Sequence, residues 1–233
     1  MARLQRLPRH VAMVMDGNRR WARRHGYASP SDGHRRGLQH ISTVLDWCAE
    51  LGIPQVTIFV ASNDNLRKRG SGEVERFLGY VEEVVAARPP EGWRIHLAGR
   101  LDMLPESTRH ALERAALSTR DASIGQLTLA VGYDGRDEIV DALRSLLRER
   151  ARAGATPGEV AATLTADDIA EHLYTTGLPD PDLIIRTSGE QRLSGFLLWQ
   201  ATRARLHFAK VCWPGFGKSD FMRALVAYSR LGG

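Results

Sequence analysis

The sequence has little lysine, little cysteine and no long uninterrupted hydrophobic run. Lysine occurs only at Lys68, Lys210 and Lys218, so nearly all of the 32 lysine and arginine residues are arginines. No segment approaches the roughly 18 apolar residues that cross a membrane. The N-terminal stretch "MARLQRLPRH" is basic but lacks the apolar core of a secretory signal. We therefore expect at most peripheral contact with a membrane.

The two cysteines, Cys48 and Cys212, lie far apart in the 233-residue chain. This spacing provides neither a disulfide framework nor a cysteine-based metal site. Cys48 falls in the helical pattern "VLDWCAEL", where a buried thiol is the simplest interpretation. A chain with this cysteine usage suits a reducing compartment, so we expect a cytoplasmic protein.

The net charge is +5, and arginine carries the positive charge. Arginine suits polyanionic partners, which include phosphates, nucleic acids and acidic membranes. A general preference for arginine codons explains scattered arginines, but it explains less well why arginines cluster beside strand ends. No recognition helix or platform of aromatic residues accompanies them, so we expect no nucleic-acid partner.

Apolar runs typical of strands alternate with helical patterns along the whole chain. Several strand runs are continuously apolar, as expected for strands buried on both faces of a parallel sheet. No repeat or change of composition divides the chain, and 43% hydrophobic residues suffice for one large core. The sequence therefore predicts a single α/β domain over 1–233, with a central, mostly parallel sheet of about six strands flanked by helices. The predicted strands are 10–15, 55–60, 94–99, 126–133 and 182–186, with 205–208 as a weaker candidate, and the predicted helices are roughly 19–25, 34–51, 73–87, 106–119, 136–153 and 167–175.

Turn and cap residues support these boundaries. Thr165 of "TADD" is the expected cap of the last predicted helix. The stretch "ARAGATPGE" at 151–159 is expected to be a surface loop, and "LPDPD" breaks the chain before the fifth strand. Because ligands of open parallel sheets collect at the carboxyl ends of the strands, the residues that follow each strand are the first candidates for a binding site.

The first strand ends in "DGNRRW", where Gly17 and Asn18 permit a tight turn into a helix. The helix N-terminus attracts anions, and Arg20 can bind a phosphate through two donors. Asp16 would repel that phosphate unless a cation lies between them, and Mg2+ is the natural bridge. A structural role for Asp16 as a cap of the helix remains equally open at this point.

The second and fifth strand ends extend this chemistry. "TSGEQR" follows the fifth strand and lies between Arg186 and Arg192, so hydroxyls, turn N–H groups and two guanidinium groups make a second candidate anion pocket. The second end offers Ser62, Asn65 and the basic run "RKR". Two phosphate pockets and one carboxylate suggest two phosphorylated substrates that meet at a divalent ion, although a surface loop with incidental charges is the alternative.

Seven ordered motifs carry a family resemblance: "HVAMVMDGNRRWARRHG", "GHRRG", "SNDNL", "VGYDGRDEIVDA", "DPDLIIRTSGEQRLSGFLLWQ", "WPGF" and "RLGG". Together they resemble the cis-prenyltransferases, the undecaprenyl diphosphate synthase family, almost from end to end. The variants present are most similar to the short-chain actinobacterial (2Z,6E)-farnesyl diphosphate synthase type. The resemblance implies a Mg2+-dependent homodimer that condenses an allylic diphosphate with isopentenyl diphosphate and forms a new cis double bond.

The resemblance also implies roles for individual residues. Asp16 would bind Mg2+ and help the allylic diphosphate ionise, and Asn65 and Ser62 would lie over the reacting carbons. The terminal Arg230 and Gly232 would close the site across the dimer, and Arg19 and Trp21 belong to the same substrate-binding stretch as Arg20. The residues implied to hold the allylic diphosphate are Gly17, Asn18, Arg20 and His34, those for isopentenyl diphosphate are Arg186, Arg192 and Ser194, and Lys68 or Arg69 approximates a further arginine of the family.

One position bears on product length. In the family, a larger side chain near the end of the second strand shortens the product, and Val60 there is bulkier than the alanine typical of long-chain members. This favours a short product of about 15 carbons made from dimethylallyl or geranyl diphosphate. The simpler interpretation of Val60 is an ordinary strand residue.

The chain also departs from the family. Arg205 stands where a glutamate commonly acts as a second metal ligand, and a guanidinium cannot keep that role. Arg205 could instead take the electrostatic position of the metal and hold phosphate directly. Gln191 stands where some members have histidine, Arg203 replaces a tyrosine, and Pro30 replaces an arginine. Two alternatives therefore stay open: a divergent enzyme that couples two allylic diphosphates or makes a specialised terpenoid, and a non-catalytic subunit of a prenyltransferase complex.

Overall fold

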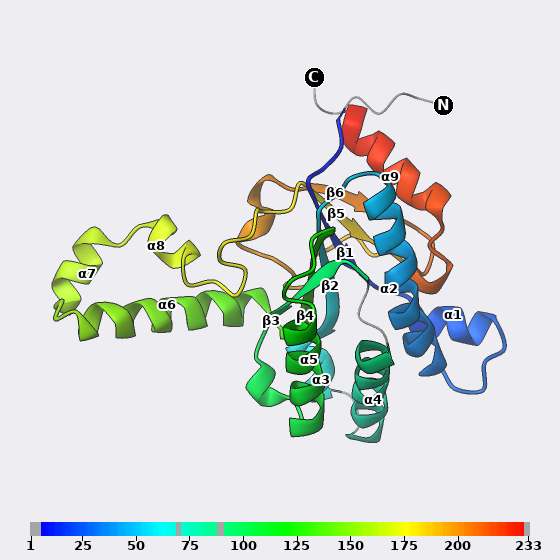
Figure 1. The fold of residues 1–233 in the computed structure, drawn as a ribbon, viewed down its shortest axis with the longest axis horizontal. Helices are drawn as coiled ribbons and strands as arrows, with labels where there is room; N and C mark the ends of the chain where they lie inside the picture. The colour runs from blue at the N-terminus through cyan, green and yellow to red at the C-terminus, as the bar shows by residue number, and fades with distance from the viewer. Residues whose placement is uncertain (1–5, 69–70, 88–90, 231–233) are drawn as a thin grey trace.

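Six parallel strands form one sheet in the order β3-β4-β2-β1-β5-β6. The computed structural model describes residues 6–68, 71–87 and 91–230 (Figure 1). The predicted single α/β domain with a parallel sheet of about six strands is confirmed, and the weak candidate at 205–208 is the edge strand. The strands are β1 His10–Val14, β2 Gln55–Ser62, β3 Trp93–Ala98, β4 Gly125–Tyr133, β5 Leu183–Arg186 and β6 Arg205–Phe208.

The helices match most of the predicted ranges, with two corrections. The predicted loop at 151–159 is wrong at its end, because Thr156 forms a capping box with Glu159 and starts a short helix. The predicted helix 167–175 ends at Ala170, and turns follow it; Thr165 caps it as predicted. The helices are α1 Asn18–Arg24, α2 Asp32–Glu50, α3 Asn63–Lys68, α4 Ser71–Ala87, α5 Glu106–Ser118, α6 Gly135–Arg152, α7 Pro157–Thr163, α8 Ala166–Ala170 and α9 Lys218–Arg230, with 3-10 turns η1 Leu101–Met103, η2 Gln200–Arg203 and η3 Trp213–Gly215.

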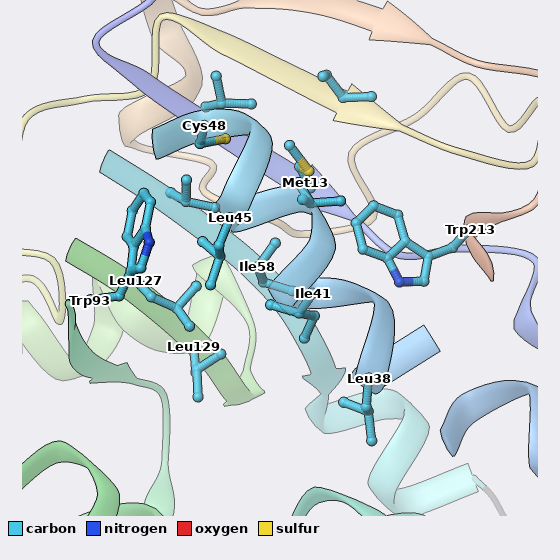
Figure 2. Close-up of a cluster of buried hydrophobic side chains, with 14 of the residues drawn as sticks. Met13, Leu38, Ile41, Leu45, Cys48, Ile58, Trp93, Leu127, Leu129 and Trp213 are labelled. Carbon is cyan, nitrogen blue, oxygen red and sulfur yellow. The ribbon is translucent and has the colours of Figure 1, made fainter. Parts of the chain in front are cut away.

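The larger core fills one face of the sheet. Residues of α2, α4, α5 and α9 pack there against alternate strand residues, as expected for strands whose side chains alternate between faces. The helix α9 was not predicted, although Phe221, Ala224, Leu225 and Tyr228 are buried at helical spacing. Figure 2 shows the centre of this core, where Leu38, Ile41, Leu45 and Cys48 of α2 meet Met13, Ile58, Leu127 and Leu129 of the strands.

The opposite face of the sheet is covered mainly by irregular chain. Phe196 and Leu197, from the segment after β5, are buried against the strands there, and Tyr133 and Phe59 pack against Phe196. Helix α6 leaves the sheet and continues with α7 and α8 as an arm (Figure 1). Among the described residues, no helix is long and apolar enough to span a membrane.

Candidate active site

A cleft of about 600 Å³ opens at the carboxyl ends of β1, β2, β4 and β5. This is the edge at which an open parallel sheet places its ligands. The structure brings most of the predicted site residues together there. The predicted residues that line the cleft are Asp16, Gly17, Asn18, Arg19, Arg20, His34, Ser62, Asn65, Arg186, Arg192 and Ser194.

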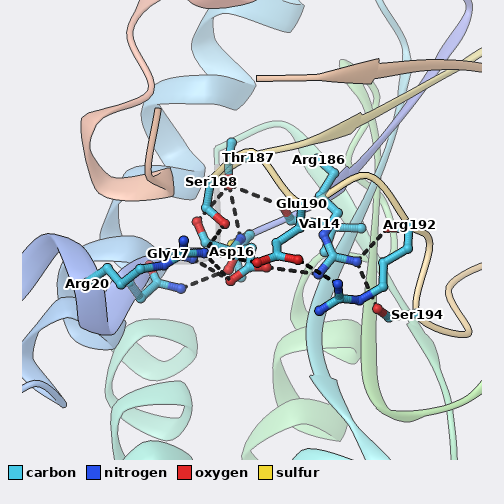
Figure 3. A network of polar contacts seen from close by, with 12 residues as sticks. Val14, Asp16, Gly17, Arg20, Arg186, Thr187, Ser188, Glu190, Arg192 and Ser194 are labelled. Atoms are coloured by element: carbon cyan, nitrogen blue, oxygen red, sulfur yellow. Dashed lines mark hydrogen bonds and ion pairs between the residues drawn. The ribbon is translucent and has the colours of Figure 1, made fainter. Parts of the chain in front are cut away.

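Asp16 lies between the two predicted anion pockets (Figure 3). Its Oδ1 accepts the Gly17 N–H at 2.6 Å, and its Oδ2 accepts Nη2 of Arg186 at 2.9 Å. The Arg186 side chain is only 6% exposed, whereas the Asp16 side chain is 31% exposed and faces the cleft. Asp16 therefore holds a buried guanidinium and still presents a carboxylate to a ligand.

The loop after β5 is tied to the end of β1 by hydroxyl groups. The Thr187 hydroxyl accepts the Asp16 N–H at 3.0 Å and donates to the Asp16 carbonyl at 2.8 Å. The Ser188 hydroxyl accepts from Arg20 at 2.5 Å. The N–H groups of Ser188 and Gly189 donate to the carbonyls of residues 211 and 209. These groups therefore tie the loop to its neighbours in this structure, and the anion pocket at this turn stays a prediction.

The Arg186 side chain also holds the rest of this loop. Its Nη1 donates to the Arg192 carbonyl at 2.5 Å and to the Ser194 hydroxyl at 2.8 Å. Ser188 and Ser194 have positive φ values of 75° and 52°, a conformation that L-residues adopt only when the surroundings impose it. One buried arginine therefore positions Asp16, Arg192 and Ser194 together.

Glycines allow the first turn to approach its neighbours. Gly17 has φ of 94°, and a Cβ there would lie 2.9 Å from Cys212 and from Ser188. On α2, a Cβ on Gly37 would lie 2.2 Å from Oδ1 of Asn18. The amide of Asn18 donates to the Met15 carbonyl at 2.8 Å, so the side chain braces the turn. The tight turn expected from "DGN" is present because these positions carry no side chain.

A bulge in β2 shapes the apolar side of the cleft. The register with β4 shifts between Phe59 and Ala61, so Val60 lies at the irregularity. As a result, Val60 and Ala61 both pack on the side of the larger core, whereas Phe59 stacks on Phe196 on the other face. Val60 lines the cleft and also an apolar cavity of about 50 Å³ between α2, α4 and the sheet. It therefore separates the polar cleft from an apolar compartment.

The turn after β2 is braced by side chains beneath it. The Ser62 hydroxyl accepts the Asn65 N–H at 3.0 Å, so this hydroxyl shapes the turn that carries Asn65. The neighbouring Asn63 is 3% exposed and donates to Oδ2 of Asp137 on α6 at 2.6 Å. Oδ1 of Asp137 also lies 3.2 Å from Nη1 of Arg100. This contact fixes the turn against the first turn of α6.

The first turns of α6 also hold the loop after β5. The Gly135 N–H donates to the Gly195 carbonyl at 2.8 Å, and Asp134, which precedes it, lines the cleft. Glu138 is fully buried and accepts from the Tyr133 hydroxyl and from Nε2 of Gln200. Burial raises the pKa of Glu138 above its usual range. Helix α6 thus connects the two sides of the cleft through buried polar contacts.

Comparison with known proteins identifies the family. The prenyltransferase model that describes undecaprenyl diphosphate synthases matches residues 14–231. The chain belongs to the undecaprenyl diphosphate synthase family. The predicted family is confirmed, and as a member of this family the protein is a prenyltransferase.

Two relatives and one solved structure are similar to this chain over most of its length. An isoprenyl transferase of Streptomyces fradiae is 53% identical, and the match covers 96% of this chain and 88% of that protein. A (2Z,6E)-farnesyl diphosphate synthase of Thermobifida fusca (strain YX) is 51% identical, with 95% and 87% covered. A solved structure of lavandulyl diphosphate synthase from Lavandula x intermedia, in complex with dimethylallyl diphosphate, superposes with a TM-score of 0.86 at 30% identity and covers 96% of this chain and 95% of that one.

Some residues expected from the family resemblance do not line the cleft of this chain or lie outside the described residues. Trp21 is not among the residues that line the cleft; it stacks on His25, with ring centroids 4.2 Å apart, and also contacts Tyr27. Arg230 is exposed at the end of α9. Arg69 and Gly232 lie outside the described residues, and so does the side chain of Lys68.

Arg205 also lies away from the cleft. It is the first residue of β6 and pairs with Leu183, whereas Phe208 at the other end of β6 pairs with Arg186. Parallel strands rise about 3.3 Å per residue, so Arg205 lies roughly 15 Å below the level of Asp16. Its guanidinium lies 5.8 Å from the ring centroid of Tyr228. The expectation that Arg205 takes the electrostatic position of the metal is therefore wrong within one chain, because the start of a parallel strand lies at the opposite edge of the sheet.

The described side chains fit a metal ion only in one arrangement. Within residues 6–68, 71–87 and 91–230, no group of three His, Cys, Asp or Glu side chains could hold a metal. Asp16 offers a partly exposed carboxylate in an arginine-lined cleft. Mg2+ commonly binds to one or two carboxylates and to substrate phosphate oxygens. The site therefore fits a phosphate-bridged ion and does not fit an all-protein cage.

The sequence interpretation did not include several residues of the cleft among its candidate site residues. Arg23 and Asp134 line the cleft, and Glu190 pairs with two cleft arginines. Asp134 directly follows β4, and Glu190 lies in the loop after β5, so position after a strand was the available signal. Arg23 follows Arg19 by four residues on α1, which places both on one side of that helix.

Proposed function

We propose that this protein is a short-chain cis-prenyltransferase that condenses an allylic diphosphate with isopentenyl diphosphate. One observation carries the proposal: Asp16 lies in a single cleft between Arg20 and Arg186, with an apolar compartment behind Val60. Such a cleft can hold two diphosphate groups and an apolar tail at once. Binding both substrates side by side supplies the proximity that a bimolecular condensation requires.

The reaction breaks the allylic carbon–oxygen bond and forms a carbon–carbon bond to isopentenyl diphosphate. Pyrophosphate leaves from the allylic substrate, and a proton leaves from the isopentenyl unit to form the new double bond. Fixed guanidinium groups stabilise the negative charge that develops on the leaving diphosphate. We assign Asp16 and Asn65 to the catalytic step; the residues assigned to substrate binding are Gly17, Asn18, Arg19, Arg20, His34, Ser62, Arg186, Arg192 and Ser194.

Mg2+ is the proposed cofactor, and Asp16 is the residue that would hold it together with substrate phosphate oxygens. The ion would supply further charge stabilisation for the leaving diphosphate when bound. Arg186 donates to Asp16, so it holds the carboxylate in place at the cleft. The proposed role of Arg205 as a substitute for a metal ligand has no support in one chain.

We propose a product of about 15 carbons. The apolar cavity beyond Val60 measures about 50 Å³, which is room for only a few water-sized groups. The (2Z,6E)-farnesyl diphosphate synthase of Thermobifida fusca, 51% identical, is named for a product of this type. Geranyl diphosphate is accordingly the favoured allylic starter.

A second candidate function is the coupling of two allylic diphosphates. The observation that favours it is the superposition with a lavandulyl diphosphate synthase that holds dimethylallyl diphosphate. That relative is only 30% identical, whereas the farnesyl diphosphate synthase is 51% identical. The regular condensation therefore has priority, and an assay with allylic diphosphate alone separates the two.

We also propose that the protein acts as a cytoplasmic homodimer. Arg205 and Tyr228 lie at the edge of the sheet opposite the cleft, and Arg230 follows on α9. Because neither arginine lines the cleft of its own chain, a role for Arg230 in the site requires a second copy. Both cysteines are free and buried, which suits a reducing compartment.

Incubation of the purified protein with radiolabelled isopentenyl diphosphate and geranyl diphosphate tests the proposal. Parallel tubes omit Mg2+, replace geranyl by dimethylallyl or farnesyl diphosphate, or contain an allylic diphosphate alone. Label that moves into a longer prenyl diphosphate supports the regular condensation. A product from allylic diphosphate alone would replace it with irregular coupling, and no product in any tube would contradict both and favour a non-catalytic subunit.

A further inference from the structure

Glu190 joins two arginines that approach the cleft from different elements (Figure 3). Its Oε1 lies 3.8 Å from Nη2 of Arg20 on α1, and its Oε2 accepts Nη1 of Arg192 at 2.5 Å. Both arginines line the cleft. The family resemblance implies that Arg20 holds the allylic diphosphate and Arg192 holds isopentenyl diphosphate, so this carboxylate lies between the two proposed anion pockets.

These contacts are more exposed than the pair that Arg186 forms with Asp16. The side chains of Arg20, Arg192 and Glu190 are 44%, 64% and 32% exposed, whereas the Arg186 side chain is 6% exposed. Exposed ion pairs contribute little to folding stability. Glu190 should therefore affect ligand binding by these guanidinium groups more than the stability of the fold.

The surroundings allow Glu190 to exchange its partners with little change elsewhere. The Ser188 hydroxyl keeps Arg20 in place, and Arg186 holds the backbone carbonyl of Arg192. The Gly189 N–H donates to the carbonyl of Ala209, which anchors the backbone just before Glu190. Only the Glu190 carboxylate has to turn away from Arg20 when a phosphate takes its place.

We propose that Glu190 is an internal competitor for pyrophosphate that promotes its release. Carboxylates and phosphates are alternative acceptors for the same guanidinium donors. When pyrophosphate is bound, the nearby carboxylate repels it, and when it departs, the carboxylate takes up the donors that it leaves. This inference rests on the proposed function, because it takes pyrophosphate to be the product that must leave.

The variant Glu190→Gln tests the inference, because it removes the charge and keeps the shape. Isothermal titration with inorganic pyrophosphate, with and without Mg2+ at fixed ionic strength, measures the change. We expect Kd to fall about two- to tenfold. The matched control is Glu113→Gln, which removes the same charge from an exposed arginine pair on α5 and should leave Kd unchanged.

Unchanged binding of pyrophosphate by Glu190→Gln would overturn the inference, because Glu190 would then have no effect on this ligand. Weaker binding would also overturn it, because Glu190 would then orient the arginines for the ligand. Release of pyrophosphate after a single turnover provides a second readout, and we expect it to be slower in the variant. This outcome is separate from the proposed function. If the wild-type protein makes a prenyl product and binds pyrophosphate as tightly as the variant, the competitor role fails and the condensation stands.

Discussion

At the scale of single residues, Asp16 and Arg186 define the site. Their contact joins the end of β1 to the end of β5, and the same guanidinium holds Arg192 and Ser194. The carboxylate remains partly exposed in the cleft although it accepts two protein donors. The interpretation of Asp16 as a cap of α1 is wrong, because Gly17 is the cap residue and no side chain makes a capping hydrogen bond there. Binding of a ligand by Asp16 stays a prediction.

The variant Asp16→Asn keeps the shape of the side chain and removes its charge. We expect kcat of the condensation to fall by about a hundredfold or more, because a positioned charge at the reacting centre is lost. The fold should persist, which far-UV circular dichroism checks. Asp102→Asn in η1, away from the cleft, is the control. A variant with wild-type kcat would show that Asp16 is only structural.

A second prediction concerns acid stability. Asp141 accepts Nε and Nη2 of Arg100 at 2.7 and 2.9 Å, and these bonds lower the pKa of Asp141 to about 2. A group whose pKa is lower in the folded protein stabilises it above the unfolded pKa, near 3.8. That stability is present at neutral pH and is lost as the pH falls from about 4 to about 2.

Urea unfolding of Asp141→Asn at several pH values measures this contribution. We expect the variant to lose about 1–2 kcal/mol at pH 6, a value reduced for the partial exposure of the pair. The difference from wild type should narrow below pH 4. Asp121→Asn, at a side chain that is 88% exposed, should show no such difference at any pH. A constant gap across the pH range would contradict the account.

At the scale of elements, the bulge in β2 joins polar chemistry to product length. It turns Val60 and Ala61 toward the larger core and places Val60 between the cleft and the apolar cavity. The side chain is therefore the first obstacle that a growing tail meets.

Val60→Ala should lengthen the product. Removal of two methyl groups enlarges the compartment and costs about 1–2 kcal/mol of stability. We expect chromatography of the dephosphorylated products to show chains longer than those of wild type, with more isopentenyl units per starter. Thr128→Ala, a buried strand change outside the cleft lining, is the control for general loosening. An unchanged product distribution in Val60→Ala would show that another wall limits the tail.

Much of this architecture was predictable from the sequence, for physical reasons. Apolar runs separated by helical patterns required a parallel sheet, and strand ends identified Asp16, Asn65 and Arg186. The bulge at Val60 was not predictable, because register depends on contacts between distant strands. The roles of Thr187 and Ser188 as ties to β1 and α1 depend on the same long-range placement. The position of Arg205, in contrast, was predictable. It begins a predicted parallel strand, and the start of such a strand lies at the edge of the sheet opposite the cleft.

At the scale of the whole molecule, the two edges of the sheet differ. The cleft occupies the carboxyl edge, whereas Arg205, Tyr228 and Arg230 lie at or near the amino edge. The proposed homodimer would allow the amino edge of one copy to serve the cleft of the other. Such an arrangement makes each site depend on two chains.

Mixing two inactive variants tests this dependence. If Arg230 acts in the partner's site, a dimer of Asp16→Ala with Arg230→Ala contains one site with both residues intact. Random mixing after co-expression should then restore about a quarter of wild-type sites. Neither variant alone should regain activity. Absence of recovery in mixed dimers isolated with two different tags would contradict a role for Arg230 across the dimer.

The most direct test of the central claim is the identity of the product. Purified protein with geranyl diphosphate, radiolabelled isopentenyl diphosphate and Mg2+ is allowed to react, and the dephosphorylated product is compared with the isomers of farnesol. The account predicts a 15-carbon alcohol with a cis double bond in the newly added unit. A trans double bond there, a long-chain product, or no incorporation of isopentenyl diphosphate would contradict it.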